Sequence, residues 1–319
     1  MKKCILFCLF MPMVVFGQDR PYGKLWATRS QVIAQHGMAA TSHPLSTQAA
    51  LDVLKAGGNA IDAAIAANAM EGVVEPHVNG IGGDLYAIVW DAKTKKLYGL
   101  NGSGRSPKSL TLAEFKKRGL THIPSTGPLP VSVPGCVDAW FELHKKFGTM
   151  PMSKVLEKAV SYARNGFPVH GELASGLARV PANYGKFPNV AEHYYPSGKV
   201  PVEGDVFKNP NLANTLERLG KEGRDAFYKG DMARTMDAFM KKNGGFLSYE
   251  DLATHTSTWI DPVSVNYRGY DVWELPPNGQ GIAALQMLNI LEGYDFSKIK
   301  LGSAEHIHLF TEAKKLVFE

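Results

Sequence analysis

Cysteine is scarce in this chain of 319 residues, which contains three, two of them in an apolar segment near the N-terminus. Without that segment only Cys136 remains, which excludes an internal disulfide and a cysteine-rich metal site. We expect Cys136 to be a small buried residue that packs a helix.

Apolar runs long enough to span a bilayer, about twenty residues, are also missing. The apolar run at residues 4–16 follows two lysines and precedes the small Gly17, which is the order of a secretory signal peptide. We therefore expect residues 1–17 to be cleaved and residues 18–319 to be exported, to a periplasm or out of the cell. A permanent anchor is the alternative, but the run is short and contains Pro12.

A large charge imbalance is absent as well. The formal net charge of +5 falls to about +3 once Lys2 and Lys3 are removed, because residues 1–17 contain no acidic residue. This value does not point to a nucleic-acid partner. An apolar fraction of 45% and a charged fraction of 20% are those of a globular chain, and we expect an α/β (α+β) protein.

Signatures of metal, nucleotide and serine chemistry are missing. No His-Glu-x-x-His spacing occurs, and His306 and His308 would point to different faces of a helix, so we expect no metal and no cofactor. The turn Gly80-Ile81-Gly82-Gly83-Asp84 lacks the Lys-Ser/Thr of a P-loop. It is instead a tight turn at a strand start, a wall for a small-substrate site, or both. Ser103 lies outside any Gly-x-Ser-x-Gly motif, so we do not expect it to be a nucleophile.

Helical and strand periodicities alternate along the chain. We expect a helix after His43 that ends at Gly57, and an alanine-rich helix, residues 60–74, that packs closely against a sheet. Two hairpins are predicted at residues 85–101 and 263–275, and two short strands between residues 25 and 40. Residues 168–206 are rich in turn signals and are predicted to be irregular. Further helices are expected over residues 111–119, 136–147, 153–164, 210–221, 229–242, 281–293 and 303–319.

Arg105 is the leading candidate for a binding residue. It follows a predicted strand and the flexible sequence Gly102-Ser103-Gly104. There its planar guanidinium could make two parallel hydrogen bonds with a carboxylate. The alternative is a solvated or ion-paired surface arginine.

Several ordered motifs make the sequence resemble the gamma-glutamyltransferases (gamma-glutamyltranspeptidases), over roughly residues 31–319. The motifs in the first half are Thr41-Ser42-His43-Pro44-Leu45, Gly57-Gly58-Asn59-Ala60-Ile61-Asp62, Val74-Glu75-Pro76-His77, Gly80-Ile81-Gly82-Gly83-Asp84 and Ser132-Val133-Pro134-Gly135. Those in the second half are Phe147-Gly148-Thr149-Met150-Pro151, Ala163-Arg164-Asn165-Gly166-Phe167 and Pro276-Pro277-Asn278-Gly279-Gln280-Gly281.

The resemblance implies the αββα sandwich of the N-terminal-nucleophile hydrolases, made as one precursor that cuts itself into a large and a small subunit. Residues 18–319 would be the large-subunit portion, truncated at its C-terminus, with the small-subunit strands absent and the small subunit as its heterodimer partner. The implied activity is a γ-glutamyl acyltransferase and hydrolase acting on glutathione and other γ-glutamyl compounds.

In the family, self-cleavage exposes a catalytic threonine whose α-amino group, with a pKa near 8, serves as the base. That threonine would lie beyond Glu319, so no residue of this chain is assigned a catalytic role and the fragment alone is expected to be inactive. Arg105 would hold the α-carboxylate of the γ-glutamyl group. Two alternatives stay open: a cephalosporin or glutaryl acylase on the same scaffold, and a non-catalytic exported module that binds carboxylates.

Overall fold

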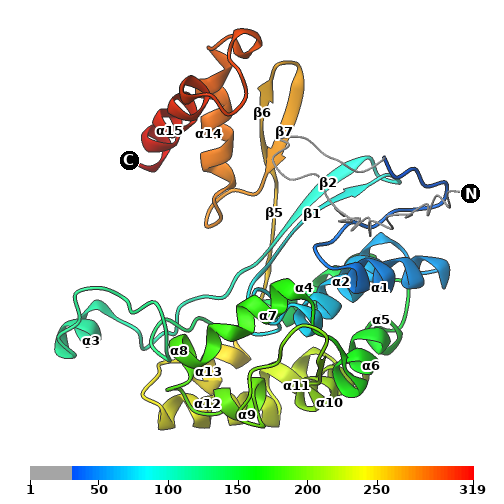
Figure 1. Ribbon diagram of the computed structural model, residues 1–319, viewed down its shortest axis with the longest axis vertical. Coiled ribbons are helices and arrows are strands. Elements are labelled where there is room, and N and C mark those ends of the chain that lie inside the picture. The colour runs from blue at the N-terminus through cyan, green and yellow to red at the C-terminus, as the bar shows by residue number, and fades with distance from the viewer. Residues whose placement is uncertain (1–30) are drawn as a thin grey trace, which may run out of the picture. The chain divides into compact units, whose positions relative to one another are not determined.

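Three small antiparallel sheets organise the strands of residues 31–319, the part of the chain that this computed structural model describes. The first sheet has the order β1-β2-β5, with β1 at Leu85–Asp91, β2 at Lys96–Gly102 and β5 at Thr258–Ile260 (Figure 1). In the β1–β2 hairpin Leu85 lies opposite Gly102 and Asp91 opposite Lys96. The predicted hairpin is therefore confirmed, and both β1 and β2 meet the loop of Arg105 at one end.

The other two sheets each contain two strands. The hairpin of β6 (Val263–Tyr267) and β7 (Tyr270–Glu274) was predicted, whereas β3 (Phe167–Pro168) and β4 (Val206–Phe207) were not. Helix α14 (Gly281–Glu292) packs against both strands of the β6–β7 hairpin and against α15 (Ala304–Phe318), as Figure 1 shows.

Helices make up most of the remaining ordered structure. Contacts within residues 39–319 define one compact unit, and the residues up to Met38 fall outside it. The helices between the N-terminus of this unit and β3 are α1 (Pro44–Lys55), α2 (Ala60–Val74), α3 (Leu112–Lys117), α4 (Cys136–Phe147), α5 (Met152–Val155) and α6 (Glu157–Asn165). Those that follow are α7 (Gly171–Ala178), α8 (Val180–Tyr184), α9 (Val190–Tyr194), α10 (Pro210–Glu222), α11 (Arg224–Tyr228), α12 (Asp231–Lys242), α13 (Tyr249–Ala253) and the 3₁₀ turn η1 (Phe296–Lys298).

The start of α2 is fixed by a buried carboxylate. The Asn59 side chain accepts from the amides of Ile61 and Asp62, and the Asp62 carboxylate accepts in return from the amide of Asn59, which completes a capping box. Asp62 is fully buried and also accepts from the Thr149 hydroxyl over 2.7 Å. The carboxylate therefore ties α2 to the turn after α4 with its charge fully hydrogen-bonded.

The core surrounds α2 and α4. Met70 and Val74 of α2 and Val137 of α4 are fully buried, and Trp140 of α4 is 1% exposed. Helix α2 packs chiefly against α1, α6, α4 and α5, so the expectation that it packs against a sheet is wrong. Helix α4 contacts β1 and β2 instead. The small side chains of α2 allow close packing, but its neighbours are helices.

Two further expectations need correction. Residues 31–40 contain no strand, and the remainder of the predicted pair, residues 25–30, lies outside the described residues. The segment 168–206, predicted to be irregular, contains α7, α8 and α9. The proposed signal peptide, residues 1–17, also lies outside the described part of the chain. Across residues 31–319 no helix combines the length and the apolar character needed to cross a membrane.

Candidate functional site

The loop of Arg105 is held by backbone contacts that only glycine allows. The carbonyl oxygen of Val133 would lie 1.6 Å from a Cβ atom placed on Gly104. The Val133 amide donates to the carbonyl oxygen of Arg105 over 3.0 Å. On the other side the amide of Gly104 donates to the Asp84 carboxylate over 2.9 Å. Two segments distant in sequence therefore fix the backbone from which the Arg105 side chain extends.

A second close approach joins the first turn of α4 to the end of β2. A Cβ atom on Gly135 would lie 1.9 Å from the carbonyl oxygen of Gly102. The carbonyl oxygen of Gly83 accepts from the amides of Gly135 and Cys136 over 3.0 and 2.9 Å. The glycine turn thus binds amides at the start of α4 that have no partner within the helix.

The Arg105 side chain is exposed. Among residues 31–319, no carboxylate lies within ion-pair distance of its guanidinium, and no hydrogen bond from its side chain is formed. The cation is therefore not buried against a structural aspartate. A rigid backbone and an unpaired guanidinium are what binding of an external carboxylate requires.

A polar cluster lies beside this loop. The Ser103 hydroxyl donates to the Asn101 side chain over 2.7 Å. The side-chain amide of Asn278, from the loop between β7 and α14, donates to the Ser103 hydroxyl over 3.0 Å. The side-chain amide of Asn101 donates in turn to the side-chain oxygen Oδ1 of Asn278 over 2.8 Å. The hydrogen-bond partners of Ser103 within residues 31–319 are therefore side-chain amides of asparagine.

Asn278 is a residue of this region that the sequence analysis did not single out. It belongs to the Pro276-Pro277-Asn278-Gly279 turn, which lies between the predicted hairpin and the predicted helix and gave no sign of its neighbours. Its contact with Ser103 spans 175 positions of sequence, so no local pattern could have predicted it.

The glycine turn at residues 80–84 also lines a cavity of about 660 Å³. The opposite wall includes His193, Asn209 and Leu212. The turn therefore precedes β1 and also forms part of a cavity wall, and its role as the wall of a small-substrate site stays a prediction. Arg105 is not among the residues that line this cavity.

Buried side chains hold the first turn of α4 in place. The Tyr228 hydroxyl donates to the carbonyl oxygen of Pro134 over 2.7 Å and accepts from the amide of Asp138 over 3.0 Å. The Asp138 carboxylate is ion-paired with Arg224. Burial raises the pKa of the Cys136 thiol to about 12, so this residue is an unreactive packing group, as expected.

A second polar cluster, in which His43 and Glu75 are buried, joins the start of α1 to the end of α2. The Ser42 hydroxyl donates to Glu71 over 3.2 Å and also to Glu75. The ring centroids of His43 and His170 are 4.8 Å apart, and His170 Nε2 lies 4.0 Å from Glu75. Burial raises the pKa of Glu71, and the adjacent carboxylate adds to this effect. Burial and repulsion from His170 lower the pKa of His43.

Histidines do not assemble into a metal site in the part of the chain described. Among residues 31–319 no group of three or more histidine, cysteine or acidic side chains could hold a metal ion. His306 packs against the rings of Phe296 and Phe310.

Comparison with known proteins places this chain in a family. The model of the gamma-glutamyltranspeptidase family matches residues 46–319, and the chain belongs to that family. The glutathione hydrolase-like YwrD proenzyme of Bacillus subtilis is 40% identical over 90% of this chain and 54% of its own length. The chain spans about half the length of the curated relatives it matches.

Solved structures agree in fold. Gamma-glutamyltranspeptidase of Helicobacter pylori has a TM-score of 0.85 at 31% identity and covers 91% of this chain and 84% of its own. Cephalosporin acylase of Bacillus halodurans also has a TM-score of 0.85, at 42% identity, covering 94% of this chain and 57% of its own. The mixed helix and strand fold of the N-terminal-nucleophile hydrolases is therefore confirmed.

A Cβ atom at position 104 should disrupt the Arg105 loop. We expect Gly104→Ala to lower the free energy of unfolding by about 1–3 kcal/mol, because the new methyl group overlaps a backbone oxygen that cannot rotate away. Gly82→Ala is the matched control, since the space around position 82 is open. Urea unfolding of both variants measures the difference, and equal stability would contradict the close approach.

The His43 imidazole should make stability depend on pH. Its pKa in the folded protein is lowered by burial, so its contribution is present above the unfolded value of about 6.5 and is lost as the pH falls through the folded value. We expect His43→Asn to reduce this acid-induced loss, because asparagine can still cap α1, as His43 now does with Leu45. Unfolding free energies across that pH range measure the effect.

The control for this prediction is His122→Asn, which replaces an exposed histidine on a loop. This variant should follow the wild-type pH profile. If His43→Asn also follows it, the proposed titration of His43 is wrong.

Proposed function

We propose that this chain is the large-subunit portion of an exported enzyme that transfers or hydrolyses the γ-glutamyl group of glutathione and related compounds. Residues 1–17 would be a signal peptide and residues 18–319 the mature portion, acting in a periplasm or outside the cell. Membership of the gamma-glutamyltranspeptidase family supports the reaction class, and the relatives named glutathione hydrolase support glutathione as the leading substrate.

The observation that carries this proposal is the exposed, unpaired guanidinium of Arg105 on a loop whose backbone is fixed on both sides. In this proposal Arg105 binds the α-carboxylate of the γ-glutamyl group through two parallel charge-assisted hydrogen bonds. A fixed backbone lowers the entropic cost of placing the side chain, so more of the interaction remains as binding free energy.

The bond-breaking group would come from the small subunit formed by self-cleavage of the precursor. Its N-terminal threonine would attack the γ-amide carbonyl after its own α-amine takes the hydroxyl proton. The acyl group moves to the threonine oxygen, the leaving amine takes the proton, and water or an amino acid then accepts the acyl group. Backbone N–H groups would stabilise the oxyanion.

The exposed apolar face of β1 is evidence for a second polypeptide layer that covers it. Tyr86, Ile88 and Trp90 alternate along this strand and are 42%, 41% and 60% exposed. The intervening residues face the core, so β1 is apolar on both faces, as strands in the middle of a sandwich are. We propose that the small subunit covers this face in the heterodimer.

An acylase of the cephalosporin or glutaryl type is the second candidate. The higher identity with the cephalosporin acylase of B. halodurans, 42% against 31% for the H. pylori transpeptidase, favours it. Hydrolysis of a γ-glutamyl anilide and of the matching glutaryl anilide by the full-length gene product separates the two. The glutaryl compound keeps the terminal carboxylate and lacks only the α-amino group, so we expect a preference for the γ-glutamyl compound only if the enzyme also binds that amine. The reverse preference would favour the acylase, and turnover of neither would favour a non-catalytic binding module.

The role of Arg105 is tested by Arg105→Lys in the full-length gene product. A lysine ammonium cannot reproduce the two-pronged contact, so we expect KM for the γ-glutamyl anilide to rise about tenfold or more with a smaller change in kcat. The control is Arg234→Lys at an exposed position on α12, which should leave both constants unchanged. Unchanged KM and kcat in Arg105→Lys would contradict the assignment.

A further inference from the structure

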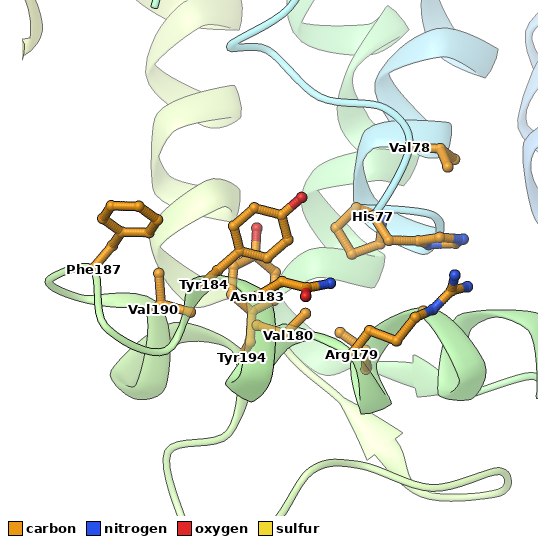
Figure 2. A pocket seen from close by; sticks show the side chains of 12 residues that line it. His77, Val78, Arg179, Val180, Asn183, Tyr184, Phe187, Val190 and Tyr194 are labelled. Atoms are coloured by element: carbon orange, nitrogen blue, oxygen red, sulfur yellow. The ribbon is translucent and has the colours of Figure 1, made fainter. Parts of the chain in front are cut away.

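A cavity of about 550 Å³ lies between the segment after α2 and the short helices α7, α8 and α9 (Figure 2). Its volume is within the range of about 300–1,000 Å³ that small-molecule sites occupy. Arg105 is not among its lining residues, and neither is any residue of the polar cluster around Ser103. The lining residues are Pro76, His77, Val78, Gly176, Leu177, Arg179, Val180, Asn183, Tyr184, Phe187, Val190 and Tyr194.

One side of this cavity offers hydrogen-bond donors. Figure 2 shows the guanidinium of Arg179 and the ring of His77 on the same side of the pocket. Arg179 uses its Nε to donate to the carbonyl oxygen of Ser175 over 3.3 Å. Among residues 31–319 no carboxylate pairs with Arg179, so its two terminal amino groups are available to an external anion.

The position of His77 depends on a glycine. A Cβ atom on Gly176 would lie 2.8 Å from the His77 ring, so a larger residue of α7 would push the ring away. The Nδ1 atom of His77 is buried and has no hydrogen-bond partner within the described residues. A buried polar atom without a partner is costly unless a ligand or water satisfies it.

The other side of the cavity is apolar and aromatic. The rings of Tyr184 and Phe187 lie across from His77 in Figure 2, and Tyr194, Val180 and Val190 complete this wall. Tyr184 is 43% exposed although it carries an aromatic ring. Aromatic walls of this kind favour a flat apolar group, which can stack against the rings.

We propose that this cavity binds a small aromatic carboxylate, with its carboxylate on Arg179 and His77 and its ring among Tyr184, Phe187 and Tyr194. An anion without a ring would leave the aromatic wall empty. A neutral aromatic compound would leave the Arg179 guanidinium without an anionic partner. The two halves of the cavity together therefore select a molecule that carries both groups.

The site has a structural link to the Arg105 region. Pro76, His77, Val78 and Tyr194 line both this cavity and the cavity beside the glycine turn. A bound carboxylate would therefore contact the same segment that leads to Asp84. The binding proposal does not depend on the γ-glutamyl reaction, because ligand binding is measured without turnover of a substrate.

Binding is tested by titrating the full-length gene product with N-acetyl-L-phenylalanine in a calorimeter. We expect saturable binding of one molecule per chain. N-acetyl-L-phenylalaninamide, which lacks the carboxylate, and N-acetylglycine, which lacks the ring, should each bind about tenfold more weakly or worse. Absence of saturable binding at millimolar concentrations overturns the proposal. Equal binding of the amide overturns the role of the carboxylate.

Variants locate the site. Arg179→Gln should weaken binding of N-acetyl-L-phenylalanine about tenfold, and Tyr184→Ala should weaken it by a similar factor. Both positions are exposed, so neither change should prevent folding, and unchanged thermal unfolding confirms this. The matched control is Lys199→Gln, which removes a cation at an exposed position that does not line the cavity. A loss in this control as large as in Arg179→Gln would show nonspecific charge attraction and overturn the site.

Discussion

Close backbone packing of Gly102, Gly104 and Gly135 determines where the Arg105 side chain can lie. At each position a Cβ atom would overlap a backbone or side-chain atom of a neighbouring segment. The end of β2, the residues before α4 and the turn before β1 can therefore approach one another to hydrogen-bonding distance. Glycine loses more backbone entropy on folding than other residues do. In return, the close contacts fix the backbone that carries the long Arg105 side chain. This compensation explains why so flexible a local sequence forms so fixed a loop.

Buried charges support the same region from several directions. Asp62, Asp138 and Asp251 are all buried, and each accepts backbone amides from a segment distant in sequence. Hydrogen bonds from these amides offset the cost of burying each charge, and Arg224 adds an ion pair to Asp138. Each carboxylate therefore makes one segment's position depend on another's. The Arg105 loop benefits directly, because Asp138 lies on α4, whose first turn contacts the glycine turn and the end of β2.

Sequence patterns predicted the bounds of helices and strands better than the elements against which they pack. The alanine-rich helix was predicted with its observed bounds, residues 60–74, because the capping by Asn59 that starts it is a local effect. The same helix was assigned to the wrong neighbours, because small side chains allow close packing against any partner. The segment 168–206 was predicted to be irregular since its helices, such as Val180–Tyr184, are too short to show a period. Residues 102–104 made Arg105 a candidate, and its binding role stays a prediction, whereas Asn278 reaches the same region through a long-range contact and leaves no local signal.

Residues 75–84 connect three features of the structure. Glu75 belongs to the polar cluster with His43, His77 lies in the aromatic cavity, and Asp84 holds the backbone next to Arg105. Energetic coupling between sites requires an element with two arrangements that both sites influence. Here Gly80 and Gly82 stand between His77 and Asp84 with open space around them, whereas Gly83 and Asp84 are tied to α4 and to Gly104. Gly80 also accepts from the Gly83 amide, and Ile81 packs against the core, so the turn resists a displacement that begins at His77. This anchoring favours independent occupation of the cavity and of the Arg105 position.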